Sequence, residues 1–203
     1  ESSFASIDSI REIKWLRFAG AIGLGLVAAF LFGLLRRRGW SLATAAFTAA
    51  TVSLAPAAQV IASWATAWPY TVAALLSLSG FALADSANER WRVSRWTGAT
   101  LLMALAALVY QPSGLFYCVG IAAALPDRRG RSWGDNLRWT SVHLGIVFTG
   151  LAAAFLIVKG LYLTGAFEAS ARIAFERDPF GKLWWFLQEP LPNALSLFVL
   201  NDD

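Results

Sequence analysis

The chain has little charge and few of the side chains that usually build metal or redox sites. Charged residues make up 15% of its 203 residues, against roughly 25% in an average soluble protein. The single cysteine, Cys118, excludes a disulfide within the chain and a thiolate metal cluster. The single histidine, His143, excludes a metal site built from several histidines of this chain. No glycine-rich phosphate loop, His-x-x-x-His pair or Ser–His–Asp order is present, so the sequence carries no motif of a soluble enzyme.

Apolar residues dominate instead. They make up 57% of the chain, and the mean hydropathy is +0.54. All ten tryptophans lie at or beyond the edge of a long apolar run or in the amphipathic tail. A membrane places indoles at its two headgroup layers, where the apolar ring and the polar N–H are both satisfied. We therefore expect a multi-pass membrane protein. The tryptophans that lie beside apolar runs are Trp15, Trp40, Trp64, Trp68, Trp91, Trp96, Trp133 and Trp139.

Several stretches approach the roughly 20 apolar residues that a helix needs to cross about 30 Å of hydrocarbon. A further stretch, 97–125, is too long for one crossing and is interrupted at Gln111 and Pro112. It is either one kinked helix or a hairpin of two short helices, Thr97–Tyr110 and Gly114–Leu125, each too short to cross alone. The four predicted spans are Trp15–Leu35, Ser41–Ala62, Trp68–Ala84 and Thr140–Leu163.

The distribution of charge favours the hairpin. With a hairpin, the loops at 36–38, 90–95 and 128–138 fall on one side, which then holds ten arginines against four acidic residues. Cytoplasmic loops are enriched in lysine and arginine. We predict an all-α polytopic transmembrane bundle of about six membrane segments, forming a single domain over residues 1–203. Both chain ends are expected to be extracytoplasmic. Because topology accounts for the basic residues, the expected partner is membrane lipid and no nucleic acid is expected.

The two ends of the chain are not predicted to span the membrane. Ile7, Ile10 and Ile13 repeat every three residues within 6–14, a pattern typical of a short interfacial helix. The tail from Phe167 is predicted to hold an aromatic helix that ends at the prolines after residue 189. Residues 195–200 are read as the possible start of another span. Because the chain begins with Glu1, we expect it to be an excerpt of a longer protein.

Polar residues at membrane depth are the candidate binding groups, because hydrocarbon penalises them unless they face a bundle interior or a cavity. Tyr110 and Gln111 lie where the two short helices of the hairpin would meet. Irregular backbone at that depth is tolerated where it is buried in protein or lines a water-filled cavity. Gln111 can donate and accept hydrogen bonds, and Tyr110 offers an aromatic face to a sugar ring. The alternative is a plain turn in which Gln111 pairs with freed carbonyl groups.

Three further residues complete the candidate set. Trp64 and Trp68 lie in an outer connection with Tyr70 and could stack on carbohydrate, or they could be an ordinary aromatic belt. Lys159 lies about one turn from the outer end of the last span. It could bind a lipid phosphate, or it could extend to the interface as lysines near helix ends commonly do. No catalytic residue and no metal ligand are assigned.

The segment Asp8–Phe18, the Trp68-Pro69-Tyr70 turn and the stretch Leu108–Ser113 together resemble polytopic membrane glycosyltransferases of the GT-C type. They are most similar to the Gtr-type glucosyltransferases that modify bacterial O-antigen. The resemblance extends over most of the chain in layout, although its motifs are short.

The resemblance implies transfer of a sugar from a polyprenyl-phosphate donor to a cell-envelope glycan or lipid-linked acceptor. It also implies a location in the bacterial inner membrane, with the reaction on the extracytoplasmic face. The acidic residue typical of the family lies in a first outer loop, which would precede Glu1. No cofactor is evident, and a divalent metal is left open. A transporter or flippase of lipid-linked substrates and a non-catalytic assembly subunit are the alternatives.

Overall fold

The computed structural model describes residues 10–86, 92–166 and 178–196, and every regular element in that part of the chain is a helix. This confirms the all-α class. Three described helices are long and apolar enough to cross a membrane, namely Ile13–Arg37, Arg92–Gly114 and Trp133–Leu163. These helices support the prediction that the chain is a membrane protein. The count of about six membrane segments stays a prediction. The chain divides into two compact units, Glu1–Gly160 and Leu161–Asp203.

The first unit begins with a long helix, α1 (Ile10–Arg37), that ends in its basic run. Gly39 follows with φ +77°, a left-handed conformation that a side chain would disfavour, and this turn reverses the chain. The predicted span Ser41–Ala62 is two helices, α2 (Leu42–Leu54) and α3 (Pro56–Ser63). The break falls at Ala55, which is extended at φ −56° and ψ 150°. A residue before a proline favours that conformation, so a single helix over this range was the wrong expectation.

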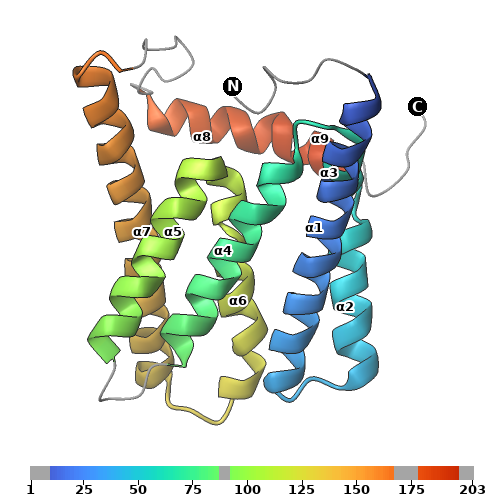
Figure 1. The fold of residues 1–203 in the computed structure, drawn as a ribbon. Coiled ribbons are helices and arrows are strands. Elements are labelled where there is room, and N and C mark those ends of the chain that lie inside the picture. Colours follow the sequence, from blue (N-terminus) through green and yellow to red (C-terminus); the bar gives the residue numbers. More distant parts are fainter. Residues whose placement is uncertain (1–9, 87–91, 167–177, 197–203) are drawn as a thin grey trace. The chain divides into compact units, whose positions relative to one another are not determined.

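The hairpin predicted from charge is present. Helix α4 (Trp68–Asp85) is followed by α5 (Arg92–Gly114) and α6 (Phe116–Ala124), which run in opposite directions in Figure 1. A short 3-10 turn, Pro126–Arg128, then leads into α7 (Trp133–Leu163). The C-terminal ends of α1, α4 and α6 therefore lie at one end of this unit, at the bottom of Figure 1. We call this the loop end; which side of a membrane it faces stays a prediction.

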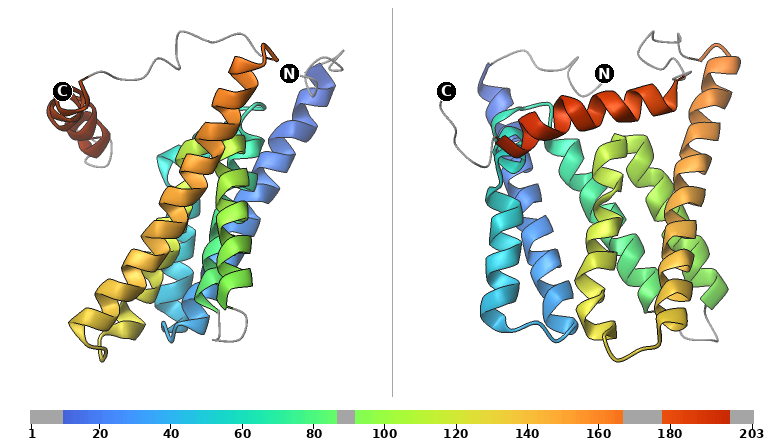
Figure 2. Two further views of the ribbon diagram at one scale, coloured as in Figure 1. Left: turned by 90° about the vertical axis from the view of Figure 1, so that its left-hand side faces the viewer. Right: turned by 180° about the vertical axis from the view of Figure 1, so that it is seen from behind.

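Helix α4 lies at the centre of the first unit and contacts α1, α5 and α6. The views in Figure 2 agree with this arrangement. Phe81 of α4 and Tyr117 of α6 are fully buried, and their rings meet edge to face at 5.6 Å between centroids. Gly120 permits this close packing, because a Cβ built there would lie 2.4 Å from the Phe81 ring. On the other side, Gly150 of α7 accommodates the buried Met103 of α5 in the same way.

The expectations for the chain ends are met only in part. Residues 6–9 lie outside the described part, and 10–14 belong to α1 rather than to a separate interfacial helix. In the second unit, α8 (Pro179–Gln188) is the predicted aromatic helix, and it ends before Pro190 as expected. A short helix, α9 (Pro190–Ser196), follows directly. The remaining predicted tail residues, 167–177 and 197–200, fall outside the described part.

Candidate functional site

The end of the first unit opposite the loop end carries the corner that the sequence predicted. The backbone of α5 is non-helical at Tyr110, with φ −162° and ψ 106°. Pro112 explains the break, because it has no N–H for the helical hydrogen bond and its ring crowds the carbonyl four residues earlier. The ring of Tyr110 stacks on that of Tyr70 from α4, with centroids 3.7 Å apart and planes 16° from parallel. This break and this ring pair define the aromatic corner.

Gln111 does not cap the turn. Its side chain is exposed and makes no hydrogen bond with any residue that the structure describes. The carbonyl of Gly114 is instead satisfied by the buried hydroxyl of Ser77, which donates to it from α4. The choice between a plain turn and a substrate-binding corner stays a prediction. Its amide is available to water or to a ligand.

The two tryptophans of the outer connection differ from each other. Trp64 ends α3 with 62% of its surface exposed. Trp68 begins α4 and is half-buried, and its indole N–H is buried without an acceptor in the described part of the chain. An unmet buried donor costs about 1–3 kcal/mol. Stacking on carbohydrate and an ordinary aromatic belt both stay predictions for these two tryptophans. The two side chains do not form one exposed platform.

Lys159 lies near the level of the aromatic corner. Met103 of α5 contacts Gly150 of α7, so these two residues lie at the same level and serve as a common reference. At about 1.5 Å per residue, Tyr110 is about 10 Å beyond Met103 and Lys159 about 13 Å beyond Gly150. The lysine is exposed, and within the described residues no hydrogen bond or ion pair joins it to Tyr110 or Gln111. The structure thus brings Tyr70 and Tyr110 together and leaves Lys159 separate.

The loop end holds a charged network that the sequence analysis did not predict. Asp85, the last residue of α4, forms an ion pair with Arg38 and accepts a hydrogen bond from the indole N–H of Trp139 at 3.2 Å. The Nε2 atom of His143 lies 3.9 Å from the same carboxylate. On its other side, Nδ1 of His143 is 2.9 Å from the hydroxyl of Tyr117, and both residues are buried. A polar chain therefore runs from the loop end into the core.

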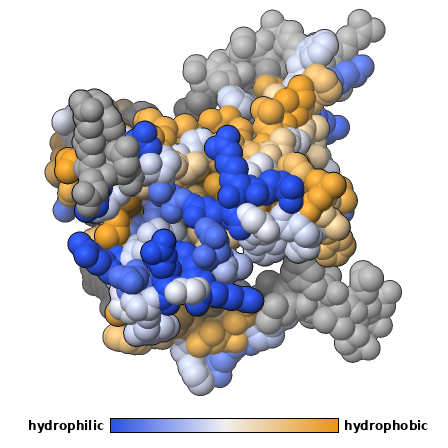
Figure 3. Space-filling model, turned by 90° about the horizontal axis from the view of Figure 1, so that it is seen from below, coloured by the Kyte–Doolittle hydropathy of each residue, from blue (hydrophilic) through white to orange (hydrophobic). Residues whose placement is uncertain are grey.

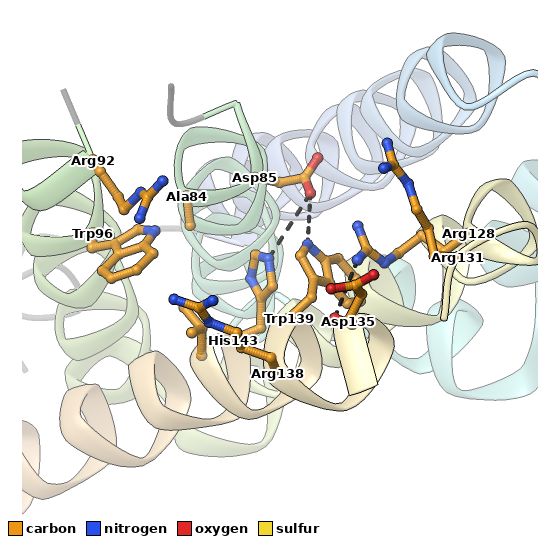
Figure 4. Close-up of a pocket in the computed structure, with 11 residues that line it drawn as sticks. Ala84, Asp85, Arg92, Trp96, Arg128, Arg131, Asp135, Arg138, Trp139 and His143 are labelled. Atoms are coloured by element: carbon orange, nitrogen blue, oxygen red, sulfur yellow. Dashed lines mark hydrogen bonds and ion pairs between the residues drawn. The ribbon is translucent and has the colours of Figure 1, made fainter. Parts of the chain in front are cut away.

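A cavity of about 520 Å³ opens beside this network (Figure 4). Four arginines and two aspartates reach its wall, with Trp96, Trp139 and His143 between them. The guanidinium of Arg128 lies 4.5 Å from the ring centre of Trp139, within range of a cation–π contact. Burial, followed by the nearby charges of Arg131 and Arg38, lowers the pKa of Arg128. The guanidinium groups lie close enough to repel one another, and a bound anion would reduce this repulsion. The charged lining residues are Asp85, Arg92, Arg128, Arg131, Asp135 and Arg138.

Hydrophilic residues also gather over the loop end when it is viewed directly (Figure 3). Here the tryptophans are more than a membrane belt. The Trp40 indole donates to the carbonyl of Ala123 at 3.1 Å, and Trp139 packs against the core. The sequence contained one usable signal for the network, since Asp85 and His143 each lie at the loop-end boundary of an apolar run. Their pairing depends on three loops meeting in space, and no local pattern encodes that.

Within the described residues, no group of three or more histidine, cysteine, aspartate or glutamate side chains could hold a metal ion. No family model matches the chain, and no curated protein or solved structure is significantly similar to it. The geometry of the aromatic corner and the basic cavity therefore carries the functional argument.

Proposed function

We propose that this chain is part of an integral membrane glycosyltransferase of the GT-C type. It would move a sugar from a polyprenyl-phosphate donor to a cell-envelope glycan. The observation that carries the proposal is the exposed amide of Gln111 at the backbone break beside the stacked Tyr70–Tyr110 pair. Among the residues that the structure describes, this amide has no hydrogen-bond partner. Helix breaks in a membrane bundle persist where they are enclosed by protein or line a polar cavity. Exposed polar groups at such a break are suited to a polar substrate.

Each group at this end has a role in the proposal. Gln111 exchanges hydrogen bonds with sugar hydroxyls, because an amide both donates and accepts. Trp64 and Tyr110 present aromatic surface to the apolar C–H face of the sugar. Lys159 is a compact cation for the donor phosphate. The indole N–H of Trp68 is a donor for a substrate oxygen once the corner opens. No residue of this chain is assigned as catalytic base.

The orientation follows from the charges. The loop end carries the three arginine-rich segments, and the positive-inside rule assigns such segments to the cytoplasm. The aromatic corner lies at the opposite end of the first unit (Figure 1), and in the proposed orientation it faces the extracytoplasmic side. In a bacterium this is the outer face of the inner membrane, where a polyprenyl-linked donor meets its glycan acceptor.

The test is sugar release from polyprenyl-phosphate-linked donors in membranes that contain the full-length protein. Gln111→Ala should lower turnover about 5- to 150-fold at equal protein level, the range expected from losing about 1–3 kcal/mol of hydrogen bonding. Gln188→Ala, an exposed glutamine on α8, is the matched control and should leave turnover unchanged.

Two outcomes would oppose the proposal. Full activity in both Gln111→Ala and Lys159→Ala would remove these residues from the site. Absence of turnover with every donor, together with movement of a lipid-linked sugar across reconstituted vesicles, would identify a flippase instead.

A further inference from the structure

An apolar groove continues from the basic cavity toward the middle of the bundle. It has a volume of about 500 Å³ and lies between α5 and α7. Trp96 and Val142 line both the cavity and the groove, so the two hollows adjoin at these side chains. Leu101, Ile146 and Thr149 line the part farther from the loop end. The molecule thus has a charged pocket with an apolar surface groove beside it.

Two of the threonines in the groove use their hydroxyl groups within their own helix. The hydroxyl of Thr97 donates to the carbonyl of Val93 at 3.0 Å, and that of Thr100 donates to the carbonyl of Trp96 at 2.9 Å. The hydroxyl groups of Thr97 and Thr100 therefore donate to their own helix and not into the groove. Gly145 keeps the groove wide, because a Cβ built there would meet no atom within 4 Å. The groove is therefore shaped for a flexible apolar chain.

The cavity is electrostatically suited to an anion. It has four arginines against two aspartates, and Arg38 already pairs with one of them, Asp85. Arg131 and Arg138 are exposed and form no ion pair with any residue that the structure describes. Their guanidinium groups suit the oxygens of a phosphate, which arginine can contact through two parallel hydrogen bonds.

We propose that the cavity and groove together form a binding site for an acidic phospholipid. Its phosphate lies among the cavity arginines and one acyl chain lies in the α5–α7 groove. The loop end is expected at the cytoplasmic leaflet, which carries the anionic lipids, and basic pockets between transmembrane helices on that side bind acidic headgroups. Free phosphate would leave the groove unused. The polyprenyl-phosphate donor of the proposed reaction belongs to the opposite end of the bundle, so this site does not depend on that reaction.

The experiment is native mass spectrometry of the full-length protein, released from vesicles of equal phosphatidylglycerol and phosphatidylcholine content. Retained phosphatidylglycerol should exceed phosphatidylcholine on the wild-type protein. The double variant Arg131→Gln/Arg138→Gln should lower this excess at least fivefold. Arg37→Gln/Arg129→Gln removes two exposed arginines from the same end but outside this cavity, and should leave the excess nearly unchanged. Equal losses in the two double variants would overturn the site in favour of a diffuse electrostatic attraction.

The groove is tested separately. Gly145→Leu places a side chain in the open groove and should displace the lipid without disturbing protein contacts. Gly160→Leu is the matched control, because a Cβ there also meets no atom within 4 Å and Gly160 is not part of the groove. A circular-dichroism melting curve for each variant shows that the fold is retained. Undiminished retention in Gly145→Leu would overturn the groove as the acyl-chain site.

Competition distinguishes the sources of the phosphate group. Inorganic phosphate at 10 mM should not displace phosphatidylglycerol, because the acyl chain supplies part of the affinity. Its complete displacement by inorganic phosphate would indicate a free-anion site instead. Polyprenyl phosphate and unlabelled phosphatidylglycerol are then compared as competitors for the bound phosphatidylglycerol. If less polyprenyl phosphate than phosphatidylglycerol is needed to displace it, the site belongs to the donor lipid. Either result would overturn the proposal.

Discussion

Arg38 and Asp85 form an ion pair that joins the end of α1 to the end of α4. Their side chains are only 19% and 12% exposed, so solvent screens the pair weakly. Asp85 also accepts a hydrogen bond from the indole N–H of Trp139. The same carboxylate therefore joins α7 to the other two helices. The loop end is organised around this one acidic group.

Removal of either charge should destabilise the protein. Asp85→Asn and Arg38→Gln should each lower the free energy of unfolding by about 1–3 kcal/mol. Arg38→Gln leaves the carboxylate of Asp85 without its cation, and Asp85→Asn leaves Arg38 with only the more exposed carboxylate of Asp127. The double variant should lose at least about 1 kcal/mol less than the two single losses added together. Chemical unfolding in detergent micelles measures all four proteins. Asp127→Asn is the control, since its carboxylate is 53% exposed at 3.4 Å from Arg38, and should cost under about 1 kcal/mol. Additive losses would show that the two charges act independently.

A methyl group at Gly120 should disrupt the contact between α4 and α6. Its Cβ would lie 2.4 Å from the Phe81 ring, which is fully buried and has no room to withdraw. We expect Gly120→Ala to cost about 1–3 kcal/mol, measured as a lower melting temperature in detergent. Gly33→Ala on α1 is the control, because a Cβ there meets no atom within 4 Å. A melting temperature for Gly120→Ala equal to that of Gly33→Ala would contradict the close approach of α4 and α6.

Ser77→Ala should weaken the turn between α5 and α6. The substitution leaves the buried carbonyl of Gly114 without its donor, at an expected cost of about 1–3 kcal/mol. Ser63→Ala removes an exposed hydroxyl that donates to Gln59 on its own helix, and should change stability by less than about 0.5 kcal/mol. Equilibrium unfolding of both variants gives the comparison. If the two variants were equally stable, the turn would not depend on Ser77.

Tyr117→Phe should destabilise the core with little change in side-chain volume. The phenol oxygen is the hydrogen-bond partner of Nδ1 of His143, 2.9 Å away in a buried setting. Its loss leaves that ring nitrogen unpaired, so we expect a cost of about 1–2 kcal/mol. Thermal unfolding followed by circular dichroism is a suitable measurement. Tyr162→Phe, a half-exposed tyrosine near the end of α7, is the control, and an equal effect there would argue against the buried hydrogen bond.

The helical class and the hairpin could be read from the sequence, because apolar runs and arginine placement are local signals. The arginines after residue 127 lie at the same end as Arg36–Arg38 only if the 97–125 stretch turns back, and the structure has that turn. The break before Pro56 also had a local signal, but the apolar run on both sides of the proline outweighed it in the sequence reading.

The functional features also differ in whether a local sequence signal marked them. Pro112 marked the aromatic corner, and Tyr110 was predicted there, but its stacking partner, Tyr70, was not. The basic cavity was missed because its residues come from the ends of three helices and from the turn between α6 and α7. Topology alone accounted for the arginines of the three basic loops, so nothing pointed to a further use for them.

The contacts of Asp85, Arg38 and Trp40 also bear on how the bundle deforms. Ion pairs and indole hydrogen bonds tie α1, α4, α6 and α7 at the loop end. In the described part of the opposite end, α5 is joined to α4 by the ring stack of Tyr70 and Tyr110 and by the hydrogen bond from Ser77 to the carbonyl of Gly114. These contacts carry no charge, whereas the loop end is held by an ion pair between side chains that are mostly buried. A disturbance of the bundle should therefore separate the two tyrosine rings before it separates Arg38 from Asp85.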